Sequence, residues 1–193
     1  MPRFRYRMAM LTTLLILSQP IAFGDALRAQ DLTVDVQKHD GMLVIDVNML
    51  VKVSPSEAWA VLTDYDHMAQ FLPNLRSSKI IEKADGKIKI DQSGAVSYGF
   101  LSVPFEVVRE IELRPDTEIL SRVISGSLKQ EFASTRLQAD GSGARIFYHS
   151  ESVPNVWVPP GIGPAFVKDE VRAQFENMRS EMMKRKRLED RPQ

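Results

Sequence analysis

Residues 75–154 form a nearly continuous series of strand patterns, and one long helical pattern follows them. Asp85-Gly86, Pro115-Asp116 and Asp140-Gly141 have the composition of turns between strands. The strand candidates are residues 76–84, 87–98, 103–114, 118–125, 128–139 and 144–153. The link between Tyr98 and Pro104 is less regular, and we expect a bulge or a loop there. This order predicts a single antiparallel sheet, which needs a covering element on one face.

The segment that follows the strands, residues 164–187, can supply that cover. Its apolar residues recur at spacings of four, four, three and four, which is typical of one apolar stripe on a helix. They are Val167, Val171, Phe175, Met178 and Met182. If the sheet curls around this helix, a hollow forms between the two.

Before residue 75, the sequence predicts one strand and two short helices. Residues 42–53 alternate between apolar and polar side chains, which indicates a half-buried strand. Ser54, Pro55 and Glu57 then supply an N-cap, a first-turn proline and a first-turn acid. Thr63 and Asp64 close this helix, and the side chain of Asp64 can cap the second one.

The first 24 residues differ in composition from the rest. Arg3, Arg5 and Arg7 precede an apolar run at residues 8–17, and small residues follow. This pattern is typical of an export signal cleaved after Gly24 or Ala26. An uncleaved N-terminal anchor is the alternative, but the run is shorter than the roughly 20 residues of a spanning helix.

The remaining chain is expected to hold one domain at residues 42–187. Residues 25–41 form a polar lead-in that ends at most in one short strand, and residues 188–193 should fray. Removing residues 1–24 takes three arginines from 25 basic residues and leaves a net charge near −3. That charge disfavours nucleic acid as a partner.

Several kinds of catalytic and metal site are excluded or disfavoured. The chain has no cysteine, which excludes disulfides, thiolate metal sites and cysteine nucleophiles. Asp64, Asp66 and His67 are the compact acidic and histidine cluster, but adjacent residues rarely converge on a metal. We therefore expect neither a metal site nor a cofactor.

Residues 62–73 read Leu-Thr-Asp-Tyr-Asp-His-Met-Ala-Gln-Phe-Leu-Pro, and Trp59 lies in the preceding helix. With the order of elements, this segment resembles the polyketide cyclase/dehydrase and coenzyme Q-binding proteins of the START-like (SRPBCC) superfamily. The resemblance covers about residues 42–187. It implies an α+β helix-grip fold, START-like or Bet v 1-like. In that fold a curved antiparallel sheet of about seven strands wraps a long C-terminal helix, and two short helices follow the first strand.

The same resemblance implies a function for the hollow. Members hold lipids, quinones, sterols or polyketides between sheet and helix, and some catalyse reactions there. The superfamily has no universal catalytic residues, so none is transferred to this chain. Asn74 and Leu75 stand where the quinone-binding relatives tend to have an aromatic residue and a cysteine, so the resemblance leaves the ligand open.

Arg109 stands out because it lies on the otherwise apolar face of residues 103–113. A buried guanidinium needs a partner. One hypothesis is that Arg109 binds an anionic ligand group or lines a solvated pocket mouth. The alternatives are a pair with an acid such as Glu131, or a bulge that turns the side chain outward.

The other candidate ligand-binding residues are apolar or aromatic and are expected along the hollow or at its mouth. They are Tyr98, Phe105, Trp157, Phe166, Val171, Phe175, Met178 and Met182. For the methionines, ordinary core packing is the alternative. Trp157 and Phe166 could gate the mouth, or could belong to a proline-stiffened, packed connection.

Lys184, Arg185, Lys186 and Arg187 end the long helix. Cations are favourable at a helix C-terminus, and this is one explanation. Peripheral contact with an anionic membrane is the other.

The leading hypothesis is an exported, periplasmic binding or carrier protein for a hydrophobic small molecule or lipid. The alternative is a cyclase- or dehydratase-type enzyme, which needs an acid–base pair such as Tyr148 or His149 with Glu106 or Glu151. Alternation places Tyr148 and His149 on opposite faces, so at most one of them lies inside. A third possibility is a partner-binding module that uses the basic helix end.

Overall fold

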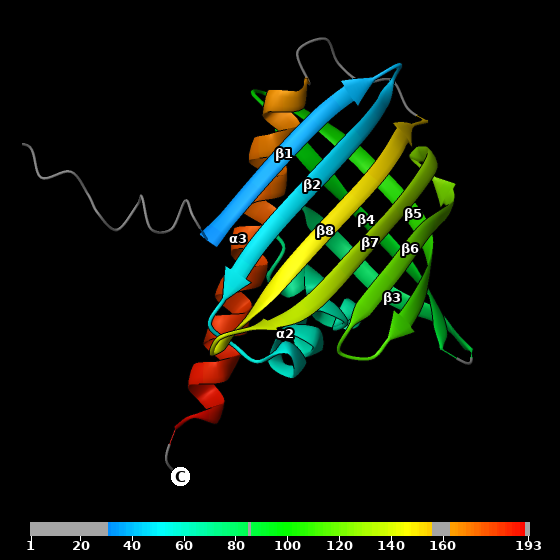
Figure 1. The fold of residues 1–193 in the computed structure, drawn as a ribbon. Helices are drawn as coiled ribbons and strands as arrows, with labels where there is room; N and C mark the ends of the chain where they lie inside the picture. The colour runs from blue at the N-terminus through cyan, green and yellow to red at the C-terminus, as the bar shows by residue number, and fades with distance from the viewer. Residues whose placement is uncertain (1–30, 85, 156–162, 192–193) are drawn as a thin grey trace, which may run out of the picture.

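One curled antiparallel sheet dominates the part of the chain that the computed structural model describes, which is residues 31–84, 86–155 and 163–191 without the side chains of Tyr98 and Leu101. Its strands are β1 Leu32–His39, β2 Met42–Val51, β3 Leu75–Ala84, β4 Lys87–Tyr98, β5 Leu101–Arg114, β6 Glu118–Gly126, β7 Leu128–Asp140 and β8 Gly143–Pro154. The spatial order is β1-β2-β8-β7-β6-β5-β4-β3. The sheet wraps the long helix α3, Pro164–Glu189, as Figure 1 shows.

The alternation of side chains decides which face of each strand lies inside. On β2, Ile45, Val47 and Met49 are buried, whereas Asp46 between them is exposed. The strands from β2 to β8 begin and end within two residues of the ranges expected from the sequence. The antiparallel sheet and its covering helix confirm the expected fold class.

Strand β1 differs from the expectation, because a full strand occupies the predicted lead-in and brings the sheet to eight strands among the described residues. Leu32 and Val34 are 0% and 4% exposed and extend the core beside α3. Arg172 of α3 donates from Nη1 to the backbone oxygen of Leu32 at 3.1 Å. Burial on one face and this bond to α3 explain why so short an apolar pattern forms a strand.

The link between β4 and β5 is also more regular than expected. Ser97 pairs with Ser102 and Tyr98 with Leu101, so the ladder continues to a two-residue turn. Gly99 supplies the positive φ of 59° that such a turn requires. The predicted bulge or loop is therefore a tight hairpin.

The helix between β2 and β3 begins as predicted. In α2, Pro55–Leu62, the Ser54 hydroxyl accepts from the Glu57 backbone N–H at 3.2 Å. The Glu57 carboxylate accepts from the Ser54 N–H in return, which completes a capping box. The second element is the 3₁₀ helix η1, Tyr65–Gln70.

Asp64 does not cap η1 with its side chain, so this expectation was wrong. Its carboxylate instead lies 2.7 Å from His67 Nδ1 and 2.7 Å from Arg185 Nη2 at the end of α3. The carboxylate thus contacts a side chain of η1 and a distant cation, and does not cap the backbone of η1. Lys186 lies 3.4 Å from Glu57 in the same region, so the basic helix end is bound to the short helices.

The predicted stripe of α3 is buried in its central part, where Phe175, Met178 and Met182 are 4%, 6% and 1% exposed. No helix among the described residues is long and apolar enough to cross a membrane. Thus α3 is the cover of the sheet, and α2 and η1 pack near its C-terminal half.

Candidate ligand-binding site

A cavity of about 250 Å³ lies between the inner face of the sheet and α3, and α2 and η1 close one end of it. Most of its wall is apolar. The apolar lining residues are Leu62, Met68, Leu72, Leu75, Phe105, Ile111, Ile119, Ala133, Val171, Phe175 and Met178. An engineered cavity of about 150 Å³ in another protein binds benzene, and many ligand pockets exceed about 300 Å³. The space suits a ligand larger than a single ring.

A buried ion pair crosses the wall of this cavity. Alternation points Arg109 of β5 and Glu131 of β7 inward, and their side chains are only 20% and 7% exposed. Arg109 Nε and Nη2 donate to the two carboxylate oxygens of Glu131 at 2.5 and 3.1 Å. This bidentate geometry neutralises both charges in place. Of the alternatives for Arg109, the structure shows the pair with Glu131.

Two uncharged residues extend the pair into a polar belt. Arg109 Nη1 donates to Gln92 Oε1 at 2.9 Å, and Gln92 Nε2 donates to the hydroxyl of Ser78 at 3.0 Å. The belt runs from β3 through β4 and β5 to Glu131 of β7. Because each link is hydrogen-bonded, the belt can hold the guanidinium in a fixed position.

Two tyrosines add hydroxyl groups to the wall. Burial raises the pKa of Tyr65, and the positive charge of Arg109 offsets part of that rise. Burial also raises the pKa of Tyr148, and the negative charge of Glu131 raises it further. The Tyr148 ring packs on Phe175 of α3 with centroids 5.5 Å apart. Both phenols stay protonated at neutral pH, so they act as hydrogen-bonding groups rather than bases.

The structure brings five of the predicted ligand-binding residues together. Phe105 and Arg109 line the cavity from β5, and Val171, Phe175 and Met178 line it from α3. Their position agrees with the predicted inner face of β5 and the apolar stripe of the helix.

Of the other four predicted residues, the two that the structure describes do not line the cavity. Met182 is 1% exposed and packs in the filled core beyond it. Phe166 is partly buried in the first turn of α3 and is not among the lining residues. Trp157 lies outside the described residues, and so does the side chain of Tyr98, which ends β4.

Some lining residues were not predicted as ligand-binding. An apolar pattern does not identify the polar residues Gln92, Gln174 and Glu131. Tyr65 lies in the short helix η1, where no such pattern can be recognised. Gln92 shares the inner side of β4 with Ile88 and Ile90, a signal that alternation does provide. Gln174 follows Val171 by three residues on the same face of α3.

The predicted acid–base pairs do not lie together in the cavity. Tyr148 faces the cavity, but His149 lies on the outer face, with Nδ1 at 2.8 Å from Asp46 and Nε2 at 3.6 Å from Glu151. Glu106 is exposed. The carboxylate of the cavity is Glu131, and the described residues hold no group of three side chains suited to a metal ion.

A curled antiparallel sheet that encloses an apolar cavity against a long C-terminal helix defines a START-like helix-grip protein. The sequence agrees, because residues 42–183 match the family described as polyketide cyclase / dehydrase and lipid transport. The chain belongs to this family. Strand β1 precedes the matched residues.

Solved structures share the fold at low sequence identity. The Zhui aromatase/cyclase from Streptomyces sp. R1128 is 16% identical with a TM-score of 0.61, over 75% of this chain and 95% of that one. The STAR-related lipid transfer protein from Xanthomonas axonopodis is 14% identical with a TM-score of 0.59, over 79% and 99%. A START superfamily protein from Mycobacterium smegmatis is 10% identical with a TM-score of 0.58, over 73% and 97%. No curated protein sequence matches the chain significantly.

Proposed function

We propose that the chain is an exported, periplasmic binding or carrier protein that holds a hydrophobic small molecule or lipid between the sheet and α3. The cavity of about 250 Å³ carries the proposal, because an apolar wall with a few fixed polar groups is typical of a small-molecule site. The family includes lipid transport in its description, and one structural neighbour is a lipid transfer protein, which supports the same class of ligand.

Export rests on the sequence. Three arginines and a short apolar run precede the described residues, in the pattern of a cleaved signal. N-terminal sequencing of the protein from a periplasmic fraction would test it. A start near Asp25 or Leu27 supports export, whereas an intact N-terminus in the cytosol contradicts it.

A cyclase-type enzyme is the second candidate, and one observation favours it. Tyr148 faces the cavity beside Glu131, so a donor and a carboxylate lie in one enclosed space. However, both carboxylate oxygens of Glu131 already accept hydrogen bonds from Arg109, which makes Glu131 a poor base. The geometry therefore supports binding better than proton transfer.

Native mass spectrometry of the mature chain, followed by solvent extraction, tests the carrier function. We expect a discrete mass above the polypeptide, or tight binding of the neutral fluorophore N-phenyl-1-naphthylamine to extracted protein. Ala133→Leu should reduce binding at least about tenfold, because Ala133 is 5% exposed and lines the cavity.

Ala139→Leu is the matched control, since Ala139 is an exposed position of the same strand. Unchanged binding in this variant and a loss in Ala133→Leu would support the cavity as the site. Equal binding by both variants, or no adduct and no probe binding by the natural sequence, would overturn the carrier proposal.

A further inference from the structure

The hairpin that joins β4 to β5 extends beyond the neighbouring strands. β3 pairs with β4 only as far as Gly94, and β6 pairs with β5 only from Val107 onward. β4 and β5 continue to pair with each other up to the turn at Gly99 and Phe100. Residues 96–105 therefore form a two-stranded ribbon that has no further strand beside it in the described part of the chain.

The ribbon carries no charge. Residues 92–105 contain no Asp, Glu, Lys or Arg, although 26% of the chain is charged. In the turn, Phe100 is 99% exposed, whereas the next most exposed large hydrophobic side chain described is Ile81 at 55%. Single exposed apolar side chains are ordinary, but a fully exposed phenyl ring on an uncharged projection indicates an interaction site.

The inner face of the ribbon continues the wall of the cavity. Phe105 lines the cavity and pairs with Gly94 across the ladder. Val103 lies two residues before Phe105 and pairs with Val96, so alternation places both valines on the same face as Phe105. Both valines are half-buried. An apolar surface thus leads from the cavity along the ribbon toward its turn.

The basic end of α3 is less suited to a membrane, because its charges are paired. Three of its side chains lie within ion-pair distance of acids, namely Lys184 with Glu181 at 3.0 Å, Arg185 with Asp64 at 2.7 Å and Lys186 with Glu57 at 3.4 Å. Attraction to anionic lipid depends on uncompensated positive charge close to the surface. These three cations are compensated, so the apolar ribbon is the stronger candidate for membrane contact.

The chemistry of the ribbon favours a lipid bilayer over a protein as its partner. A protein interface combines an apolar centre with a polar rim that forms specific hydrogen bonds. Behind Phe100 the ribbon offers only small uncharged side chains such as Ser97 and Ser102, which are exposed. A narrow apolar tip without charged neighbours suits a deformable apolar medium.

The backbone of the ribbon limits how deeply it can enter. Its two outer edges present N–H and C=O groups that no neighbouring strand binds among the described residues. Hydrocarbon cannot satisfy such groups, whereas the hydrated headgroup layer can. Only the turn can therefore reach the hydrocarbon, and the strands behind it must stay at headgroup depth.

We infer that Phe100 and the turn between β4 and β5 insert shallowly into a lipid bilayer and dock the protein on it. The inference goes beyond the proposed function, since docking is measurable whether or not the cavity holds a ligand. For a carrier, this placement brings the membrane to the outer end of the apolar surface that leads to the cavity. The contact requires no anionic lipid and resists high salt, because no charged side chain takes part.

Sedimentation with vesicles tests the docking. The vesicles consist of phosphatidylcholine alone, or of equal parts of phosphatidylcholine and phosphatidylglycerol. We expect similar binding to both at low and high salt. Phe100→Ser should lower the partition coefficient at least about tenfold, because it removes the burial of a phenyl ring. Since Phe100 is 99% exposed, the variant should fold normally.

Two variants serve as controls, and all proteins are purified in the same form, so that the apolar run at residues 8–17 is common to them. Phe132→Ser removes a phenyl ring that is 49% exposed on β7 and should leave vesicle binding unchanged. Lys184→Gln combined with Arg187→Gln should also leave it unchanged. A loss in this double variant with none in Phe100→Ser would locate the contact at the helix end and overturn the inference.

The absence of cysteine permits a local probe of the same contact. Ser102→Cys, at an exposed position of the ribbon, is labelled with the environment-sensitive fluorophore NBD. Its emission should shift to the blue and intensify when phosphatidylcholine vesicles are added. The same label at Ala139→Cys, an exposed position next to the turn between β7 and β8, should not respond.

The outcomes separate docking from the proposed function. A protein that binds N-phenyl-1-naphthylamine but no vesicle keeps the carrier function and loses the docking inference. A protein that docks through Phe100 but binds no ligand keeps the docking inference and loses the carrier function. Vesicle binding without a response of the label at residue 102 shows that another surface makes the contact. A dimer that dissociates in Phe100→Ser, with no vesicle binding, shows that the ribbon joins two copies instead.

Discussion

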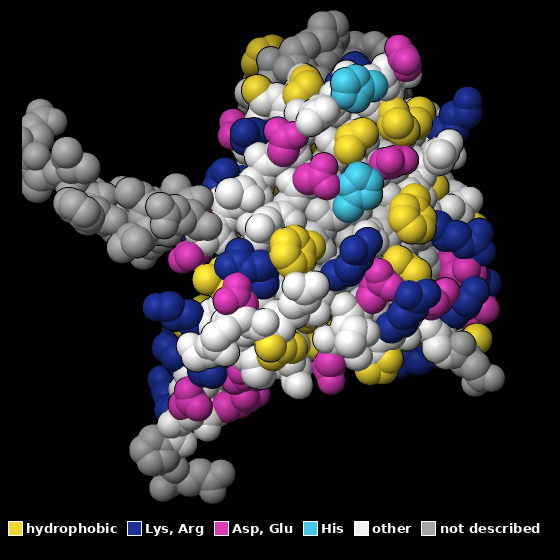
Figure 2. Space-filling view, viewed as in Figure 1, with side chains coloured by type: hydrophobic (Ala, Val, Ile, Leu, Met, Phe, Trp, Pro, Cys, Tyr) yellow, Lys and Arg dark blue, Asp and Glu magenta, His cyan; other side chains and the backbone are white. Residues whose placement is uncertain are grey.

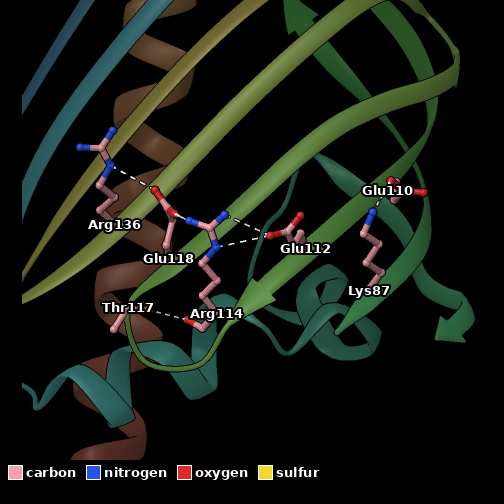
Figure 3. A network of polar contacts seen from close by, with 7 residues as sticks. All are labelled: Lys87, Glu110, Glu112, Arg114, Thr117, Glu118 and Arg136. Carbon is pink, nitrogen blue, oxygen red and sulfur yellow. Dashed lines mark hydrogen bonds and ion pairs between the residues drawn. The ribbon is translucent and has the colours of Figure 1, made fainter. Parts of the chain in front are cut away.

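The two faces of the sheet carry charge in different ways. On the outer face, acidic and basic side chains are interspersed over the surface, as Figure 2 shows. Glu118 there lies between Arg114 and Arg136, and Arg114 also binds Glu112, as the close view of Figure 3 shows. On the inner face, Arg109 and Glu131 form one pair in an apolar wall.

Exposure separates the two cases. The side chains of Arg114 and Arg136 are 55% and 65% exposed, whereas Arg109 and Glu131 are 20% and 7% exposed. Water can replace a lost partner on the outer face, so each outer pair contributes little. Inside, water cannot easily do so, and a lost partner leaves a costly charge. The same strands therefore carry exchangeable pairs outside and one obligatory pair inside.

The strongest test of this contrast is Glu131→Ala. It leaves Arg109 in the cavity wall with Gln92 as its remaining bonded partner. We expect a loss of about 3 kcal/mol in the free energy of unfolding, measured by denaturant titration. Arg109→Met combined with Glu131→Leu should recover most of that loss. If Glu131→Ala is as stable as the natural sequence, the inner pair contributes no more than the outer ones and the contrast between the two faces is wrong.

A second test compares the filled and hollow parts of the inner face. Met182→Ala opens a new void in the closed core, where Met182 is 1% exposed, and should cost about 2–3 kcal/mol. Met178→Ala enlarges the existing cavity, where its side chain already lacks neighbours on one side, and should cost about 1 kcal/mol less. Thermal and denaturant unfolding measure both losses. If the two variants lose the same free energy of unfolding, the cavity is packed as tightly as the core.

On the outer face, Glu118→Ala removes the acid shared by Arg114 and Arg136. We expect a loss of about 0.5–1 kcal/mol in the free energy of unfolding, which high salt should reduce further. A loss as large as that of Glu131→Ala would show that the outer network acts as one unit.

The smallest effect is expected at His149. Its hydrogen bond to Asp46 raises its pKa, and Glu151 adds to the rise. The folded pKa lies above the unfolded one, so the stabilisation is fully present below about pH 6.5 and is lost as pH rises through the folded pKa. The melting temperatures of the natural sequence and Asp46→Asn should differ at pH 5.5 and converge at pH 8.5.

Asp35→Asn is the matched control for this comparison. Asp35 faces Asp46 across β1 and β2, but its carboxylate accepts from Gln37 rather than from His149. Its effect should not vary with pH over the same range. A constant difference between the natural sequence and Asp46→Asn at both pH values would exclude the ion pair.

Local patterns predicted the elements of the fold better than the contacts between them. Alternation located β2 to β8, and the stripe located α3, because both depend on neighbours within a few residues. Alternation also placed Arg109 inward. Its partner could only be suggested, since Glu131 lies 22 residues away and is reached across β6.

Asp64 shows why local chemistry can mislead. An aspartate before a short helix favours a cap, but Arg185 lies 121 residues further along the chain and binds it instead. The hydroxyl of Ser121 is buried without a hydrogen bond among the described residues, and the sequence does not show this, because its surroundings depend on Ile111 and Ala133 in the neighbouring strands. Such features depend on the complete register of the sheet.

The contact between β1 and α3 has a consequence for the order in which the chain acquires structure. Leu32 is joined to Arg172 across 140 residues, and β2 pairs with β8, so Leu43 lies beside Ser152. Contacts this distant in sequence slow folding, because long loops must close before they form. The sheet cannot be completed until almost the whole chain has been synthesised. A newly made chain therefore stays incompletely folded until its last strand and helix have been synthesised.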